Sequence, residues 1–492
     1  MSLNASESEP QLVGWKATSD DRGSLDLLWS CLVTLLLCCW VTTYPNAGSP
    51  HDKWYHPLLD KFNLAIITFL GPDFLFGIAL GQYASARESV KVFKRDKHLT
   101  RGAEWKYIHA FFFDMGCVHL TAPDYSIADG KTFPINAEQL HYLARHNHVE
   151  FPDLDQLEIE DRNSVDTLSR IITVFQALWF TVKELARIHK GYPITTLELT
   201  TLSFCFITFM ISILWYHKPS ITKPQFIETK DGTTIEQIRT FARWNTHLDL
   251  ENTYYRTPLE FIGRKRFGID AHWNYYVSLA HKLRINFVSR PITRRPWDRV
   301  PSDMWICPGP WYAPGAAIVL AGFSIIFVLA WDFTFPTEKE KFLWRICSAY
   351  HAAFSLYGGA YYAIEMARQN RKKEKEPTRA GRQLSNLQRE QSDLPDTESQ
   401  RTPSQRTTPT RGRVGLFLER ARSWRNLSEN QDPNMEVPLR IIIPITITCF
   451  AYVLCRFYIY LEDLISLRMQ PADVYLTVNK FLPFSSWGSV DS

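Results

Sequence analysis

The 492-residue sequence lacks the short motifs that mark several large enzyme classes. It has no Walker A loop and no GxGxxG turn, so neither ATP-driven transport nor dinucleotide chemistry is predicted. It also has no Gx-Ser-xG elbow, no HExxH pair and no aspartate-rich motif for prenyl diphosphates. We therefore predict no cofactor and no metal site.

The cysteines and the net charge argue against two further classes of protein. No two of the nine cysteines form a CxxC pair, and no spacing among them suggests a zinc site. The net charge of +4 gives no reason to expect a nucleic-acid partner. Most cysteines fall in apolar runs and are interpreted as small packing residues: Cys31, Cys38, Cys39, Cys205, Cys347, Cys449 and Cys455.

Apolar residues are plentiful but clustered. The mean hydropathy of −0.19 suggests a soluble chain, although it averages charged stretches with apolar ones. Several windows reach about 20 residues with little charge, the length that crosses a hydrocarbon layer of about 30 Å. Trp, Tyr and Phe crowd the ends of these windows, as in interfacial belts. We predict an all-α polytopic membrane protein with seven transmembrane helices, at 24–44, 63–83, 168–187, 196–216, 312–331, 342–364 and 439–460.

Basic residues set the predicted orientation. Lys and Arg gather in residues 82–167, 217–311 and 368–438, whereas the other connections are nearly bare. Because such residues collect on the cytoplasmic side, we expect all three loops there. This requires every one of the seven spans, including 168–187 with its internal Lys183. The N-terminus is then cytoplasmic, and the C-terminus lies on the opposite side.

The predicted spans divide the chain into pairs of transmembrane helices and the segments that connect them. The loop segments differ in composition, because one is rich in Ser, Thr, Gln, Pro and charge and the others contain many aromatic residues. The predicted segments are a cytoplasmic N-terminal segment 1–23, spans one and two 24–81, a partly ordered cytoplasmic loop 82–167, spans three and four 168–216, a partly ordered cytoplasmic loop 217–311, spans five and six 312–364, a disordered basic linker 368–412, an amphipathic interfacial helix 413–427, span seven 439–460 and an amphipathic C-terminal tail 461–492.

Asp73 lies near the middle of the apolar stretch NLAIITFLGPDFLFGIALGQY. An ionised Asp at the bilayer centre costs about 2.5–3.5 kcal/mol on insertion scales. Pro72 breaks the helical hydrogen-bond pattern, and Gly71, Gly77 and Gly81 permit close packing. We expect a broken or bent helix whose polar centre faces the protein interior. Asp73 is then either a proton donor, ion ligand or substrate contact, or a structural carboxyl held by Arg, Thr or a backbone N–H.

Other ionisable and aromatic residues of the spans are candidates for the same interior. Glu198 and Glu365 are alternative acids to Asp73. For each candidate, simple helix packing is the competing interpretation. The predicted lining residues are Gln176, Trp179, Arg345, His351, Tyr357 and Tyr361.

Six motifs are spread along the chain: the opening GWKATSDDRGSLDLLWS, the GPD of the second span, HAFFFDMG, PITTLE, WYHKP and RRPWDRVPSD. Together they resemble motifs of a group of fungal multi-pass membrane proteins. The family implies a membrane protein of unassigned activity, with some members near specialised-metabolite pathways. It supplies no catalytic residue. The usual GPE of the family is GPD here, so a carboxylate is retained at Asp73.

These observations support three functional hypotheses. The first is an accessory factor or a cofactor-free cyclase or isomerase that acts on a lipophilic intermediate of a fungal specialised-metabolite pathway. Asp73 would deliver the proton, and aromatic faces would stabilise a developing cation. The alternatives are a membrane transporter or channel and a membrane receptor or scaffold. The expected partners are the lipid bilayer, a lipophilic small molecule and cytoplasmic proteins, in the endoplasmic reticulum, another endomembrane or the plasma membrane.

Overall fold

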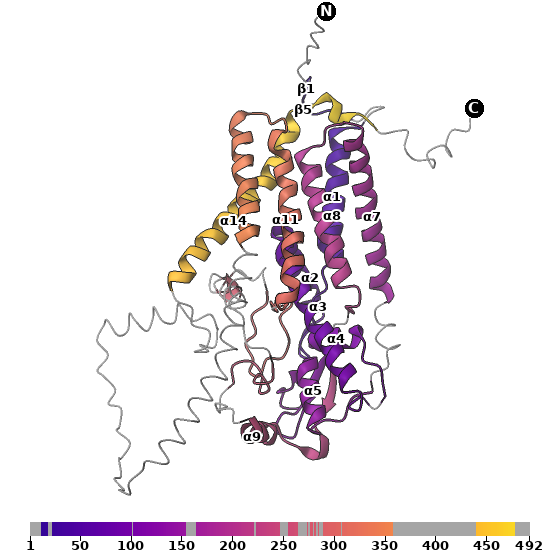
Figure 1. Cartoon of the computed structure of the whole chain (residues 1–492), viewed down its shortest axis with the longest axis vertical. Coiled ribbons are helices and arrows are strands. Elements are labelled where there is room, and N and C mark those ends of the chain that lie inside the picture. Colours follow the sequence, from indigo (N-terminus) through magenta and orange to yellow (C-terminus); the bar gives the residue numbers. More distant parts are fainter. Residues whose placement is uncertain are drawn as a thin grey trace, which may run out of the picture.

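The computed structural model describes most of the chain and shows a mostly helical protein (Figure 1). Four sequence predictions lie outside the described residues: the linker 368–412, the interfacial helix 413–427, Tyr361 and Glu365. The described residues are 11–17, 22–100, 102–153, 164–220, 223–246, 254–263, 289–306, 308–357 and 439–477, with isolated residues between 273 and 284.

Long helices run side by side in a bundle (Figure 1). Local signals fix where some of them begin. The Thr195 hydroxyl accepts the N–H of Glu198, and the Glu198 carboxylate accepts the N–H of Thr195, which forms a capping box at the start of α8. The bundle consists of α1 (Ser24–Val41), α7 (Ser164–His189), α8 (Thr196–Leu214), α11 (Ala313–Val328), α14 (Leu439–Ile465) and a helix over residues 338–357.

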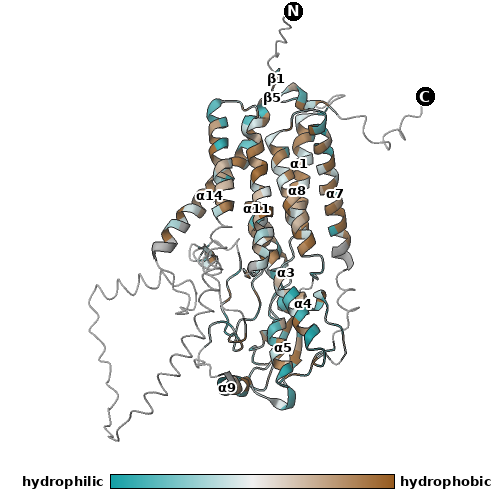
Figure 2. Cartoon of the chain, viewed as in Figure 1, coloured by the Kyte–Doolittle hydropathy of each residue, from teal (hydrophilic) through white to brown (hydrophobic). Residues whose placement is uncertain are grey.

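The helices of the bundle are rich in hydrophobic residues (Figure 2), and many of these side chains are exposed. Ile171 and Phe175 of α7 are exposed, as are Phe450 and Phe457 of α14. By length and composition, three helices can cross a membrane, and a bent helix pair makes a fourth candidate. The described residues therefore hold three or four candidate spans, fewer than the seven predicted. The three helices are Ser24–Val41, Thr196–Leu214 and Ala313–Asp332.

The second apolar run is not one continuous helix. It forms α2 (His56–Leu70) and α3 (Pro72–Arg95), which are bent by 119° at Gly71. The prediction of a broken or bent helix is thus confirmed. The predicted span 63–83 therefore contains a 119° bend at the Gly-Pro pair, and the two helices form either a broken span or a re-entrant loop.

Both ends of this helix pair lie at the same end of the bundle. Near the start of α2, the Asp60 carboxylate pairs with Arg290 at 2.5 Å. Near the end of α3, Phe93 stacks on Trp105, with ring centroids 4.3 Å apart. Trp105 and Arg290 belong to the two long segments that follow α3 and α8. We call this end of the bundle the loop end, and the pair α2–α3 the hairpin.

The two segments predicted as separate loops, 82–167 and 217–311, share one small sheet at the loop end. Its order is β3-β2-β4, with β2 parallel to β4 and antiparallel to β3. The elements at this end are α4 (Tyr107–Asp114), β2 (Val118–Thr121), β3 (Phe133–Pro134), α5 (Ala137–Arg145), β4 (Gln225–Glu228) and α9 (Ile235–Thr246). We call them together the loop-end domain.

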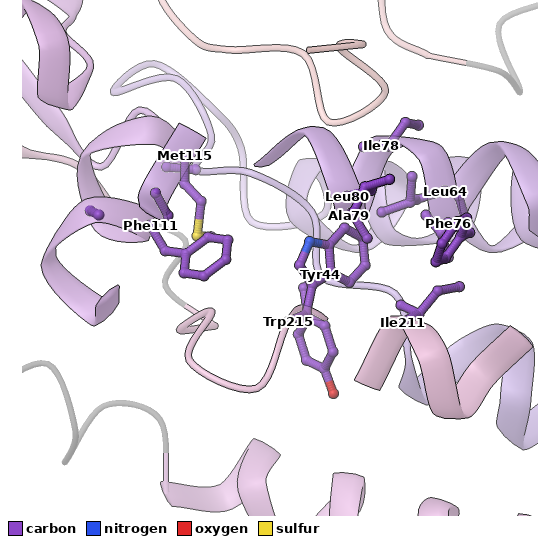
Figure 3. Packing of buried hydrophobic residues seen from close by; sticks show 14 of the residues in the cluster. Tyr44, Leu64, Phe76, Ile78, Ala79, Leu80, Phe111, Met115, Ile211 and Trp215 are labelled. Atoms are coloured by element: carbon purple, nitrogen blue, oxygen red, sulfur yellow. The ribbon is translucent and has the colours of Figure 1, made fainter. Parts of the chain in front are cut away.

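One apolar core joins the loop-end domain to the bundle (Figure 3). Tyr44 and Trp215 meet edge to face, with ring centroids 6.0 Å apart. Met115 and Phe111 of the domain and Ile211 of α8 belong to the same buried cluster. The domain is therefore packed against the helices rather than tethered to them.

The N- and C-terminal segments meet at the other end of the bundle (Figure 1). β1 (Leu12–Val13) pairs antiparallel with β5 (Gln470–Pro471), and the N–H of Arg22 donates to the carbonyl of Tyr475 at 3.2 Å. We call this the terminal end. The two terminal segments, which the sequence analysis placed on opposite sides of a membrane, thus pair with each other at the end of the bundle away from the loop-end domain.

Candidate functional site

The tip of the hairpin lies inside the bundle. The N–H of Gly71 donates to the carbonyl of Ile67 at 2.8 Å and ends α2. Pro72 then begins α3, a position where its missing N–H costs nothing. The hydroxyl of Tyr460, from α14, donates to the carbonyl of Phe69. The last helix of the chain thereby holds the tip in place.

Asp73 lies in the first turn of α3 and is only 9% exposed. The Tyr452 hydroxyl donates to its Oδ1 at 2.7 Å. Free N–H groups at a helix N-terminus also favour a carboxylate. The acid thus faces the protein interior, as the sequence predicted, and its nearest polar neighbours come from α14.

Arg456 is buried beside the hairpin tip, with 1% of its surface exposed. Its Nε donates to the Tyr460 hydroxyl at 2.8 Å. Its Nη1 and Nη2 are buried and meet no hydrogen-bond partner among the described residues. The guanidinium carbon lies 4.9 Å from the ring centre of Phe327, 5.0 Å from that of Phe323 and 5.6 Å from that of Phe204. The cation is held by aromatic faces rather than by a carboxylate.

His351 of helix 338–357 completes the group and is 1% exposed. Its ring lies 4.7 Å from Tyr452 and 5.9 Å from Phe327, centre to centre. Its Nε2 is buried and has no hydrogen-bond partner in the described part of the chain. Asp73, His351, Tyr452 and Arg456 therefore form one polar site inside the bundle, which we call the central site.

Sequence reasoning selected Asp73 and His351 but did not select Tyr452 or Arg456. A signal was present, because Tyr452, Arg456 and Tyr460 follow one another at intervals of four residues. Residues four apart share one face of a helix. An arginine flanked by two tyrosines at this spacing inside an apolar run therefore indicates an inward polar stripe.

Glu198 lies in a different cluster at the terminal end. Its Oε1 pairs with Arg22, and its Oε2 accepts the N–H of Thr195 at 2.8 Å. Glu184 and Arg187 of α7 are equally buried and pair with each other at 3.6 Å. Arg22, Glu184, Arg187 and Glu198 thus form a balanced cluster, which we call the terminal cluster. The structure therefore places Glu198 in a different cluster from Asp73, with Arg22 as its ion-pair partner.

The other described candidates also lie away from the central site. Trp179 is 44% exposed and Tyr357 is 52% exposed on the outside of the bundle. Gln176 is half-buried on α7. Arg345 pairs with Asp332 at 2.9 Å, where the latter side chain is 86% exposed. These residues are not gathered around Asp73.

A buried lysine explains the WYHKP motif. Lys218 donates to the carbonyl of Tyr44 at 2.7 Å and to Gln82 Oε1 at 2.9 Å. Its ammonium also lies 4.2 Å from the ring centre of Trp215. Burial lowers the pKa of Lys218 well below its usual range. The residue joins the end of α1, the hairpin and the end of α8.

The RRPWDRVPSD motif lies beneath the hairpin at the loop end. Arg290, just before it, binds Asp52 and Asp60 together, which holds the pKa of Asp52 down at about 2 against the opposing effect of burial. Burial raises the pKa of Asp303 to about 6. A small polar cavity here is lined by Asp60, Asn63, Leu64, Ser289, Arg290, Arg299, Ser302 and Asp303.

Metal binding finds no support in the described residues. No group of three or more His, Cys, Asp or Glu side chains there is placed to hold an ion. His141, from the histidine-rich stretch, instead pairs with Asp96 at 2.8 Å. His119 is buried against Thr132, and burial lowers its pKa to about 4.

Comparisons with known proteins identify a family but no characterised relative. No curated protein and no solved structure matches the chain. A family model matches residues 1–246, which include the hairpin, Asp73 and Glu198 but not His351 or Arg456. This match covers half of the sequence, and the chain therefore belongs to DUF8562, a family of unknown function.

Proposed function

We propose that the chain is an integral membrane transporter with six crossing helices and a re-entrant hairpin. Three crossing helices are the apolar α1, α8 and α11. The other three are α7, α14 and helix 338–357, which carry more charge, and part of that charge is buried, as with Glu184 and Arg187 of α7 and Arg456 of α14. Their outer faces are apolar over most of their length: Leu168, Ile171, Ile172, Phe175, Leu178, Val182 and Leu185 on α7, and Ile443, Ile447, Phe450, Val453, Leu454, Phe457, Leu461 and Leu464 on α14.

The loop end is assigned to the cytoplasm in this proposal. The C-terminal part of α3, which leads into this end, is rich in Lys and Arg, with Arg87, Lys91, Lys94 and Arg95. Six crossings then place β1 and β5 together on the other side. The membrane remains, as before, an endomembrane or the plasma membrane.

The hairpin carries the proposal. A helix that enters a bundle, breaks and returns brings a half-helix N-terminus and polar backbone to the membrane interior. Transporters use this arrangement to contact a solute between the two sides of the membrane. Here the break at Gly71 places Asp73 beside Tyr452, Arg456 and His351. Ionisable groups at such a position are functional by default.

The cyclase or isomerase hypothesis has less support. It needs aromatic faces that are free to stabilise a substrate cation. The rings of Phe204, Phe323 and Phe327 instead surround the resident cation of Arg456. Trp179 and Tyr357, the aromatic walls considered from the sequence, are on the outside of the bundle.

Flux measurements in sealed vesicles test the proposal. The purified full chain would be reconstituted and exposed to gradients of lactate, phosphate, chloride, potassium, glycerol and glucose. At least one solute should cross faster than in protein-free vesicles, and Asp73→Asn should slow it about tenfold or more. Asn retains an acceptor for Tyr452, so the fold should survive, which thermal unfolding would verify.

Asp332→Asn is the matched control. It removes a carboxylate from an exposed position at the end of α11. Its flux should equal that of the unsubstituted chain. Equal flux for Asp73→Asn, or the absence of flux for every solute, would overturn the proposal.

A further inference from the structure

Arg456 has donors that the described protein does not use. A guanidinium carries five N–H groups, and only the one on Nε is bonded here, to Tyr460. Nη1 and Nη2 are buried without a hydrogen-bond partner among the described residues. A buried charged group with free donors is costly, and a ligand that accepts them would remove that cost.

The geometry of these donors selects the ligand class. Parallel N–H groups of a guanidinium match the two oxygens of a carboxylate. Asp73 does not fill this role, because its described hydrogen bond comes from Tyr452. The rings of Phe204, Phe323 and Phe327 surround the guanidinium with apolar surface. A small monocarboxylate offers both a charged head for Arg456 and an apolar body for the rings.

The net charge of the central site indicates that a proton binds together with the anion. Asp73 and Arg456 together are neutral, so a bound anion would leave one net negative charge in a low-dielectric interior. The titratable and charged groups that face Arg456 are Asp73 on α3, His351 on helix 338–357, Tyr452, Tyr460 and Asp463 on α14, and Cys39 on α1. Asp73 belongs to the hairpin, whereas Asp463 lies nearly two turns beyond Arg456 along α14. Protonated Asp73 would no longer repel the incoming carboxylate.

We infer that the central site binds a small monocarboxylate through Nη1 and Nη2 of Arg456 and takes up one proton at Asp73 with it. This inference rests on the proposed transport function and names its substrate class. One anion and one proton would bind from one side and leave on the other. The cycle moves no net charge across the membrane.

Lactate is the probe for the first experiment, with lactamide as its neutral isostere. Vesicles containing the protein and the pH dye pyranine would receive an inward lactate gradient, with the potential clamped by potassium and valinomycin. Lactate uptake should acidify the lumen one for one and should not respond to the clamped potential. Lactamide should not be transported. Uptake that follows the potential would overturn the inference.

Two substitutions separate the roles of the residues. Arg456→Lys keeps the charge but loses the paired donors, so lactate binding should weaken about tenfold. Asp73→Asn should abolish proton-coupled uptake but retain exchange of labelled lactate for unlabelled lactate. Loss of exchange in a folded Asp73→Asn protein would contradict the assignment of the proton to Asp73. Tyr216→Phe, at a side chain that is 74% exposed, is the control for both.

A binding measurement made without vesicles distinguishes failure of the inferred substrate class from failure of the proposed transport function. Lactate added to the detergent-solubilised chain in weak buffer should raise the pH as protons are taken up. If binding and proton uptake occur but no vesicle flux is seen, the transport function fails and the site stands. If a neutral or cationic solute crosses in an Asp73-dependent way and lactate neither binds nor crosses, the inference fails and the transport function stands.

Discussion

The bundle and the loop-end domain both bury apolar residues, but they differ in what they expose. The bundle hides charged groups such as Arg187, Glu198 and Arg456 and exposes Leu, Ile and Phe. The domain hides Phe111 and Leu140 and leaves charged residues at its surface. A single hydropathy average describes neither region. A charged side chain buried in the bundle is therefore stabilised by specific protein partners, whereas a charged side chain at the surface of the domain is stabilised by hydration.

The sidedness of the two regions gives the largest expected effect. Cysteines introduced at Trp15 and Trp244, both exposed, would be tested with a membrane-impermeant maleimide on intact vesicles of one orientation. We expect one site to react and the other to react only after permeabilisation, because the bundle separates them. Labelling of both sites from the same side would contradict the proposed arrangement of six crossing helices.

A charge deleted from the bundle should cost most in stability. Glu198→Ala leaves Arg22 buried without its carboxylate, and loss of one partner of a buried pair costs about 3–5 kcal/mol. Glu88→Ala removes the partner of Lys91 at an exposed pair near the end of α3 and should cost less than about 1 kcal/mol. Thermal unfolding of the purified proteins would compare them. Similar losses for the two variants would contradict the contrast between a buried charge and an exposed one.

The junction of the two regions should respond to pH through Asp303. Its folded pKa of about 6 lies above the usual 3.8, so the folded state holds the proton more tightly. Stability is therefore greatest near pH 4 and falls by about 2–3 kcal/mol as pH rises past 6. Asp52, with a pKa of about 2, acts in the opposite direction but below this window.

Unfolding midpoints between pH 4 and 7 would measure this effect. Asp303→Asn should flatten the slope and raise stability at pH 7 relative to the unsubstituted chain. An unchanged slope in Asp303→Asn would show that another group governs the junction.

A glycine at the junction gives the smallest effect. A methyl group at Gly81 would lie 2.0 Å from the carbonyl oxygen of Ile306, so the loop-end segment must move. Gly81→Ala should cost about 1–3 kcal/mol. Gly315→Ala on α11 meets nothing within 4 Å and should cause no loss. Equal unfolding temperatures for both variants would show that the loop-end segment moves away from residue 81 without loss of stability.

The sequence predicted the parts of the fold that depend on local chemistry. Gly71 and Pro72 indicated the break, and the cost of a lipid-facing Asp73 indicated its inward position. The reversal of the hairpin was not readable, because it depends on contacts such as that of Gly77 with Trp305, distant in sequence. Rules that count basic loops assume that every apolar run crosses, so one re-entrant run, as proposed for the hairpin, would reverse the predicted orientation.

The candidate site was predictable to a lesser degree. Asp73 and His351 stood out as ionisable residues in apolar runs. Glu198 stood out equally, and only the structure shows that Arg22 holds it at the terminal end. Partners in a helical bundle come from segments hundreds of residues apart, and a single sequence does not pair them.

The pairing of β1 with β5 has a consequence for biosynthesis. β1, near the start of the chain, finds its partner β5 only after α14 has been made. The bundle is thus completed by a late step that joins the beginning of the chain to its end. Until that step, the hairpin lacks Tyr460 and the guanidinium of Arg456, and the nascent protein has no central site.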